Sequence, residues 1–351
     1  MKKASLVVIL VVCAGLAWLY ARSPASKIEY SFTEKTTGKF KDRMQPVRFA
    51  LISDIHVREK SRQEITDEKQ TRAILAAFMA SMNDDVEPDF IVQLGDLNDG
   101  CRATCGGGMD DDLIIDRLQR AQQYTEAQTN ISWFDVIGNH EYASAYEVDG
   151  SLVENKDFST IYKAINEDWS RLEDTWYYRD IKGYRFIFLN TAFPYAGASH
   201  LAPEKQVEWL AQVLESSSQP SFVFMHVPVS DGSGVAYDVA INQEKISRLL
   251  AANDSFVLGF FGHSHHSDKW DGLRRQLDAA GNIYFHVPAP HQWLGDRSGH
   301  PWVIVTVEPD EDGITVEVGT GVERSELIEF VYYLQERAVK ITSRLLANLT
   351  R

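Results

Sequence analysis

The chain has 351 residues, 44% of them hydrophobic, which is enough for one large α/β core or two smaller domains. Its formal net charge of −15 argues against nucleic-acid binding, because proteins that bind nucleic acids need basic patches to displace counterions from the phosphates. The acidic balance does not exclude a small phosphorylated substrate, since bound metal ions can supply positive charge locally.

The first 25 residues are expected to direct the chain out of the cytoplasm. Lys2 and Lys3 precede an apolar run at residues 6–20, and Ser23-Pro24-Ala25 offers a small-residue cleavage site. The run is shorter than the ~20 residues that span a bilayer comfortably. This length favours a cleaved signal peptide over an uncleaved anchor that would tether the protein to the membrane. Both alternatives predict an exported protein, periplasmic or extracellular.

A single α/β domain is expected over residues 47–320. Residues 26–46 before it are polar and weakly patterned, and they predict a linker or an edge hairpin. Strands that alternate with helices, followed by hairpins, indicate mixed β-sheets. The strands are expected at residues 47–53, 90–94, 132–137, 176–181, 184–190, 221–225, 256–261, 302–307 and 314–318, and helices at residues 67–83 and 203–214.

Two cysteines remain if the signal peptide, with Cys13, is removed. Cys101 and Cys105 are separated by three residues in a loop rich in glycine and aspartate. In an exported protein such a pair predicts a short disulfide loop, and the alternative is two free thiols.

The C-terminal segment at residues 325–349 is expected to form a helix. Its apolar side chains follow a four-three spacing over about three heptads, which is typical of a helix with one apolar seam. This seam is expected to pack on its own domain, and the alternative is a homodimer through two copies of the helix.

Five short motifs, each directly after an apolar run, hold side chains that bind metals in proteins. Because loops at the carboxyl ends of strands meet in one crevice of an open α/β sheet, these side chains are expected to converge. Imidazole and carboxylate ligands together suit zinc, iron or manganese, and one carboxylate can bridge two ions ~3.5–4 Å apart. The motifs are Asp54-Ile55-His56, Gly95-Asp96, Gly138-Asn139-His140-Glu141, His226 and Gly262-His263-Ser264-His265.

This set of motifs resembles the calcineurin-like metallophosphoesterase family, whose five blocks are all present in order. The resemblance implies an α/β fold of two mixed β-sheets packed face to face, with helices outside. It also implies two divalent or trivalent metal ions, Mn, Fe or Zn. The implied ligands are Asp54, His56 and His265 for the first ion, Asn139, His226 and His263 for the second, and Asp96 as the bridge.

The same resemblance implies the catalytic roles. His140 would contact the phosphate and protonate the leaving oxygen, and Glu141 would orient His140 or Asn139. The expected reaction is hydrolysis of a phosphodiester, a phosphomonoester or a nucleotide pyrophosphate by a hydroxide that the metals activate. The alternative is a metal-binding envelope scaffold of the same fold without turnover.

The sequence around Asp96 bears on the branch of the family. Purple acid phosphatases carry a tyrosine ligand three residues after the bridging aspartate, and Asp99 stands at that position here. Val92–Gly100 and Gly138–Tyr142 look closer to the cyclic-nucleotide phosphodiesterase-like members and to the manganese-dependent ADP-ribose and CDP-alcohol diphosphatases. The latter often lack a histidine at the position of His56. A nucleotide is therefore one expected substrate.

Overall fold

The computed structural model describes most of the predicted domain. Four predicted features lie outside the described residues: the signal peptide or anchor expected at residues 1–25, the cysteine pair, the ligand His265 and the helix expected at residues 325–349. Among the described residues, no helix is long and apolar enough to cross a membrane. The described residues are 26–35, 43–57, 65–99, 110–147, 149, 151–195, 200–229, 240–264, 273–289, 302–311 and 313–321.

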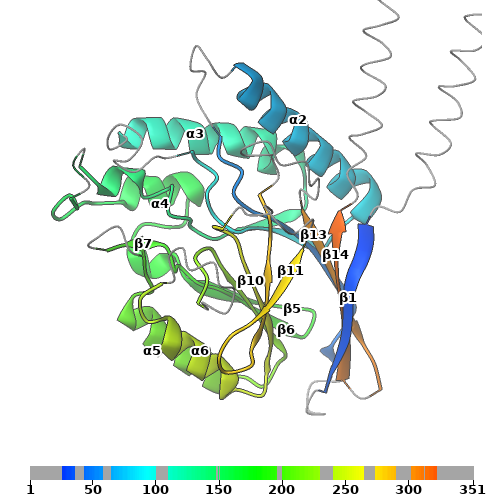
Figure 1. Cartoon of the computed structure of the whole chain (residues 1–351). Coiled ribbons are helices and arrows are strands. Elements are labelled where there is room, and N and C mark those ends of the chain that lie inside the picture. The colour runs from blue at the N-terminus through cyan, green and yellow to red at the C-terminus, as the bar shows by residue number, and fades with distance from the viewer. Residues whose placement is uncertain are drawn as a thin grey trace, which may run out of the picture.

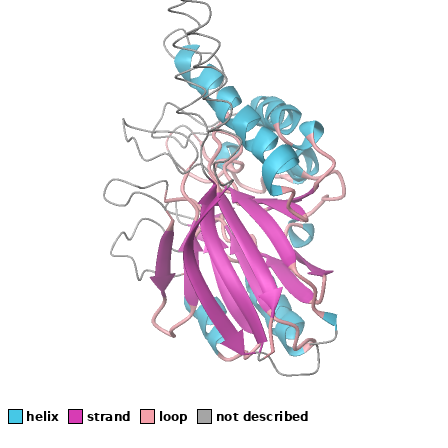
Figure 2. Ribbon diagram, turned by 90° about the vertical axis from the view of Figure 1, so that its right-hand side faces the viewer, coloured by secondary structure: helices cyan, strands magenta, loops and turns pink. Residues whose placement is uncertain are grey.

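Two six-stranded mixed sheets form the centre of the molecule, and Figure 2 shows their strands side by side with helices outside them. A short pair, β7 (Phe193–Pro194) and β8 (His200–Leu201), lies apart from both. The first sheet has the order β1 (Ser26–Lys35), β14 (Gly313–Gly321), β13 (Val303–Pro309), β2 (Val47–Ile52), β3 (Phe90–Gln93) and β4 (Ser132–Asp135). The second has the order β11 (Arg274–Leu277), β12 (Ile283–His286), β10 (Phe256–Phe261), β9 (Ser221–Met225), β6 (Tyr184–Phe188) and β5 (Tyr177–Ile181).

Helices cover the outer face of each sheet (Figure 1). Three of them, α2 (Ile65–Ser81), α3 (Asp111–Tyr124) and α4 (Ser159–Ile165), share a core with the first sheet. Two more, α5 (Glu204–Glu215) and α6 (Gln243–Ala251), pack on the second sheet. Single helical turns are η2 (Met82–Val86), η4 (Glu126–Gln128), η5 (Ala143–Ala145) and η6 (Leu172–Asp174). The predicted fold of two packed mixed sheets flanked by helices is confirmed.

Phenylalanine rings fill the space between the two sheets. The ring of Phe49 stacks on that of Phe90 at 5.1 Å and meets Phe222, Phe224 and other rings of the second sheet edge-on. The neighbour Ala50 belongs to the core under the helices instead. Successive residues of the central strands therefore enter opposite cores, which explains why these strands are continuous apolar runs.

Within the expected linker or edge hairpin at residues 26–46, the described residues 26–35 form a strand. Ser26–Lys35 is a full strand of the first sheet, antiparallel to β14, with Ser26 opposite Gly321 and Lys35 opposite Gly313. The reason is its alternation, because Tyr30 and Phe32 pack against the core between the sheets while Ser31 and Thr33 are exposed. An alternating edge strand needs few apolar residues, so its sequence is as polar as that of a linker.

Candidate metal centre

The loops that follow the parallel strands meet at one edge of the two sheets. β2, β3 and β4 run parallel in the first sheet, as do β6, β9 and β10 in the second. Backbone hydrogen bonds join the first two loops, from Asp54 N to Gly95 O at 3.0 Å and from His56 N to Asp96 O at 2.9 Å. The motifs predicted from the sequence are thus brought together by strand direction.

Several of the predicted ligands have an unusual backbone. Asp54, His56, Asp96 and His263 have φ angles of 54°, 49°, 57° and 67°, in the left-handed region. They make up half of the eight non-glycine residues with positive φ among the described residues. Such conformations are costly for residues with a Cβ, and they concentrate at functional sites, where the surrounding structure holds them.

Two glycines of the motifs allow the loops to approach each other. A Cβ on Gly138 would overlap the backbone nitrogen and a carboxyl oxygen of Asp96. A Cβ on Gly262 would overlap Oγ of Ser53. Both positions therefore require glycine because of close packing across the site.

Asp96 lies at the centre of the site. Its Oδ2 is 3.1 Å from Nε2 of His226 and 3.8 Å from Nε2 of both His56 and His140, while Oδ1 accepts a hydrogen bond from the His140 backbone. Burial alone would raise the pKa of the Asp96 carboxyl, but the charges of His226, His140 and His56 hold it well below its ordinary value. The side chain is thus an ionised carboxylate with nitrogen donors on several sides.

Two groups of potential ligands share Asp96. Asp54, His56 and Asp96 form one, and Asp96, His226 and His263 form the other, with the ligand atoms of each group within 4.8 Å of one another. Asn139 extends the second group, because its Oδ1 lies 3.0 Å from Nε2 of His226. A shared carboxylate between two clusters of oxygen and nitrogen donors fits a pair of Mn, Fe or Zn ions.

The histidines of the second group are held in a ligand geometry. Nδ1 of His226 lies 2.7 Å from the carbonyl oxygen of Leu94, which leaves Nε2 directed at Asp96. Burial opposes a charge on His226, yet Asp96 raises its pKa to about 9. Burial and the neighbouring charges of His226 and His200 hold the pKa of His263 well below its ordinary value. The carboxylates thus attract positive charge to the position of Nε2 of His226, while His263 stays neutral.

Glu141 connects the ligand loops by hydrogen bonds to their backbone. Its Oε2 accepts hydrogen bonds from the backbone nitrogens of Asp96 (3.0 Å) and Gly138 (2.8 Å), and its Oε1 accepts one from that of Asn98 (3.0 Å). Burial, followed by the charge of Asp96, raises the pKa of Glu141 to about 7. The carboxyl was expected to orient His140 or Asn139, and the structure places it on the backbone of the loops that carry the ligands.

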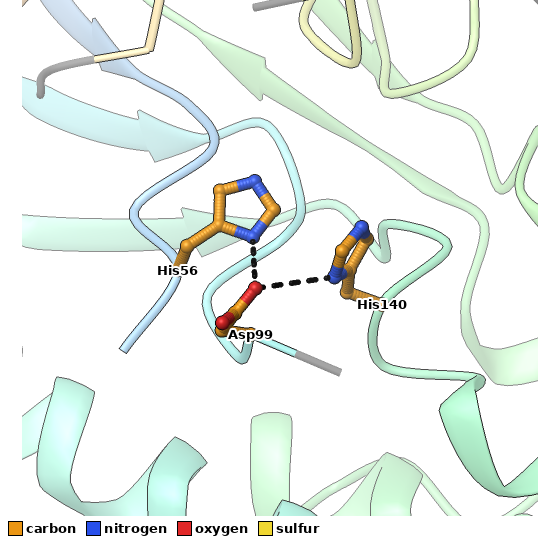
Figure 3. A group of neighbouring side chains, drawn as sticks. All are labelled: His56, Asp99 and His140. Carbon is orange, nitrogen blue, oxygen red and sulfur yellow. Dashed lines mark ion pairs between the residues drawn. The ribbon is translucent and has the colours of Figure 1, made fainter. Parts of the chain in front are cut away.

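Asp99 is a site residue that belongs to none of the predicted ligand motifs. Its Oδ1 lies 3.4 Å from Nδ1 of His56 and 3.8 Å from Nδ1 of His140, and Figure 3 shows it between the two rings. These three residues form a further group of potential ligands. The side chain of His140 is 24% exposed, whereas that of Asp96 is 1% exposed, so His140 lies on the open side of the centre.

His200 is a second residue that sequence reasoning missed. It is buried in β8, and its ring meets that of His263 edge-on, with centroids 5.2 Å apart. The His200 carbonyl oxygen accepts a hydrogen bond from Ile241 N at 2.7 Å, which fixes the strand. His200 belongs to no motif and follows no long strand, so the sequence held no pattern that could reveal it.

The comparisons with known proteins agree with this geometry. The family described as calcineurin-like phosphoesterase matches residues 47–267. A crystal structure of a dimetal phosphatase from Danio rerio has a TM-score of 0.54 at 17% sequence identity and covers 80% of this chain and 98% of its own. At this identity the likeness concerns the fold. No curated protein matches the sequence significantly.

Proposed function

This chain belongs to the calcineurin-like phosphoesterase family, and we propose that it hydrolyses a small phosphodiester, phosphomonoester or nucleotide pyrophosphate with two bound metal ions. The observation that carries the proposal is Asp96, a buried carboxylate shared by two groups of potential ligands. A carboxylate within reach of both groups can bridge two metal ions.

The proposed ligands fall into two sites. Asp54, His56 and Asp96 would hold one ion, and Asp96 with Asn139, His226 and His263 the other. His265, outside the described residues, stays a predicted ligand of the first ion. When bound, the two ions supply Lewis-acid charge to the phosphoryl oxygens and lower the pKa of a bound water.

His140 is the proposed proton donor. It lies at the open side of the centre, and Oδ1 of Asp99 lies 3.8 Å from its Nδ1 on the side away from Nε2. Nε2 is then the atom that gives a proton to the leaving oxygen, which contributes typically 10²–10⁴-fold to the rate. Glu141 and Asp99 hold backbone and rings in place and do not touch the substrate in this proposal.

The test is metal-dependent turnover of bis-p-nitrophenyl phosphate, followed by p-nitrophenyl phosphate and ADP-ribose. Protein stripped with a chelator is expected to be inactive and to recover with manganese, zinc or iron. His226→Ala is expected to abolish turnover and to lower the metal content, whereas Arg248→Ala, exposed on α6, should leave both unchanged. Full activity of His226→Ala would refute the ligand assignment, and bound metal without turnover on any substrate would favour the scaffold.

Export is part of the proposal. It rests on the lysines and the apolar run within residues 1–25 and on the composition of that segment alone. The apolar seam at residues 325–349 is expected to pack on its own domain, with a homodimer as the alternative, and sedimentation of the full chain distinguishes the two.

A further inference from the structure

An arginine lies on the buried side of α3. Arg117 is 8% exposed and belongs to a stripe of buried residues three or four positions apart, the others being Ile114, Leu118 and Ala121. A guanidinium keeps its charge in a protein, so its burial has to be offset by hydrogen bonds. An apolar side chain would fill this stripe at less cost. An arginine at this position therefore points to a specific acceptor.

The acceptor is the end of the loop that follows β3. Nη1 of Arg117 donates a hydrogen bond to the carbonyl oxygen of Asp99. The nitrogen of Asp99 donates to Val57 O at 3.2 Å, and Val57 N donates to Leu97 O at 2.7 Å. Both peptide groups beside the Asp99 Cα are thus held, one by the loop after β2 and one by α3. Because a residue has only two soft backbone dihedrals, the direction of the Asp99 side chain is then fixed as well.

That side chain stands between two imidazoles (Figure 3). Oδ1 of Asp99 lies beside Nδ1 of both His56 and His140, whose rings meet edge-on with centroids 4.5 Å apart. The His140 backbone is held separately, because its nitrogen donates to Asp96 Oδ1 at 2.8 Å and its oxygen accepts from Asn98 Nδ2 at 3.0 Å. The orientation of the His140 ring then depends on the carboxylate beside Nδ1. A displacement of that carboxylate by ~1 Å would release the ring, and misplacement of this size can cost a reaction about 10²-fold.

The helix that carries Arg117 is itself firmly placed. Its buried apolar residues belong to the core that the helices share with the first sheet. Nε2 of Gln122 donates to the carbonyl oxygens of Ala164 and Ile165 in α4, each at 3.0 Å. α3 can therefore hold the end of the loop in one position from outside the ligand motifs.

From these contacts we infer that Arg117 is a positioning residue for the reaction: by holding the carbonyl of Asp99 it keeps the Asp99 carboxylate against His140 and so orients the His140 ring toward the leaving oxygen. This inference rests on the proposed function, in which His140 is the proton donor, and it adds a residue that no ligand motif contains. Arg117 acts through Asp99, so its replacement impairs proton donation and leaves metal binding unchanged.

Two diesters that differ only in the leaving group test the inference. Methyl p-nitrophenyl phosphate releases a weakly basic phenolate that departs without a proton, whereas methyl phenyl phosphate releases a stronger base that gains from one. The measured quantities are kcat, KM and metal content of the full chain loaded with manganese. In Arg117→Met, kcat for the phenyl ester should fall about 10- to 100-fold and kcat for the nitrophenyl ester less than about threefold, with KM and metal content unchanged.

Three further variants isolate the effect. Arg120→Met removes an arginine of the same helix that pairs with Asp116 one turn away, and it should leave both rates unchanged. Arg117→Lys keeps one charged donor and should regain part of the loss. Arg117→Met combined with Asp99→Asn should lose no more than Asp99→Asn alone, because both changes act through one contact.

Each other outcome has a distinct meaning. Equal losses for both esters, or a loss of metal, would show that Arg117 only supports the fold, and this overturns the inference. Unchanged rates in Arg117→Met, or additive losses in the double variant, overturn it as well. If Arg117→Met does not fold, Arg117→Lys decides through the ratio of the two rates, and an unchanged ratio counts against the inference. Turnover of neither ester, nor of any substrate of the preceding assays, by metal-loaded wild-type protein overturns the proposed function instead.

Discussion

Replacing Glu141 by glutamine tests whether the ligand loops depend on one buried carboxyl. The carboxyl accepts three backbone hydrogen bonds at 2.8–3.0 Å, from Asp96, Gly138 and Asn98. In Glu141→Gln the amide oxygen can keep the two bonds of Oε2, and the NH₂ group then faces the N–H of Asn98. Two buried donors facing each other cost about 1–3 kcal/mol. If these 1–3 kcal/mol destabilise the metal-bound state relative to the metal-free state, metal affinity drops roughly 5- to 150-fold.

The assay is a manganese titration of turnover, with metal content measured on the same samples. Turnover at saturating manganese should recover in large part, because all ligand side chains remain. The control is Glu147→Gln. Glu147 is exposed and lies in the same loop region after β4, so this variant should behave as the wild type. Wild-type metal affinity in Glu141→Gln would refute the reasoning, and an equal loss in the control would show a general effect of charge.

Three further predictions concern residues around the centre. Asp99→Asn should lower kcat about 10- to 100-fold with the metal content retained, because the carboxylate beside His140 is lost; turnover with metal analysis checks this. His200→Ala should weaken metal binding about 2- to 10-fold in calorimetric titrations, and His200→Phe should restore most of it, since the ring contact is worth ~0.5–1.5 kcal/mol. Burial raises the pKa of Glu126 to about 7, so the folded state favours the protonated acid, and stability present below pH ~4.5 is lost as the pH rises through 7. Partial exposure limits the loss to about 1–2 kcal/mol, so Glu126→Gln should raise the melting temperature at pH 8 and leave it unchanged at pH 5.

The sequence predicted the central strands of both sheets well because both sheets are buried on two faces. Strands such as β2 and β10 are then unbroken apolar runs, and their ends are marked by the motif residues. Parallel direction brings Asp54 and Asp96 to one edge whatever the intervening sequence. The family and the convergence of the described residues of the five motifs thus follow from information that is local in sequence.

Other features depend on contacts that are distant in sequence. β1 is recognised as a strand only through its pairing with β14, nearly 300 residues away, since its own composition is polar. α3 was missed because its apolar residues are few and its buried face includes Arg117. His200 becomes a site residue only because β8 lies beside the loop of His263. No periodicity of side chains encodes such a neighbour.

The proposed metal centre also explains why a stable domain keeps residues with left-handed backbone conformation and buried charges at one edge of its sheets. Asp54 and Asp96 are fully buried, Asp99 faces two imidazoles, and each of these arrangements opposes folding unless positive charge is supplied. Protonated histidines supply part of it, as the raised pKa of His226 shows. Two cations would supply more and would bind only the folded arrangement, so metal binding and folding are linked. The local strain is therefore offset by the ligands that the site is shaped to hold, and the surrounding sheets need only keep the loops together.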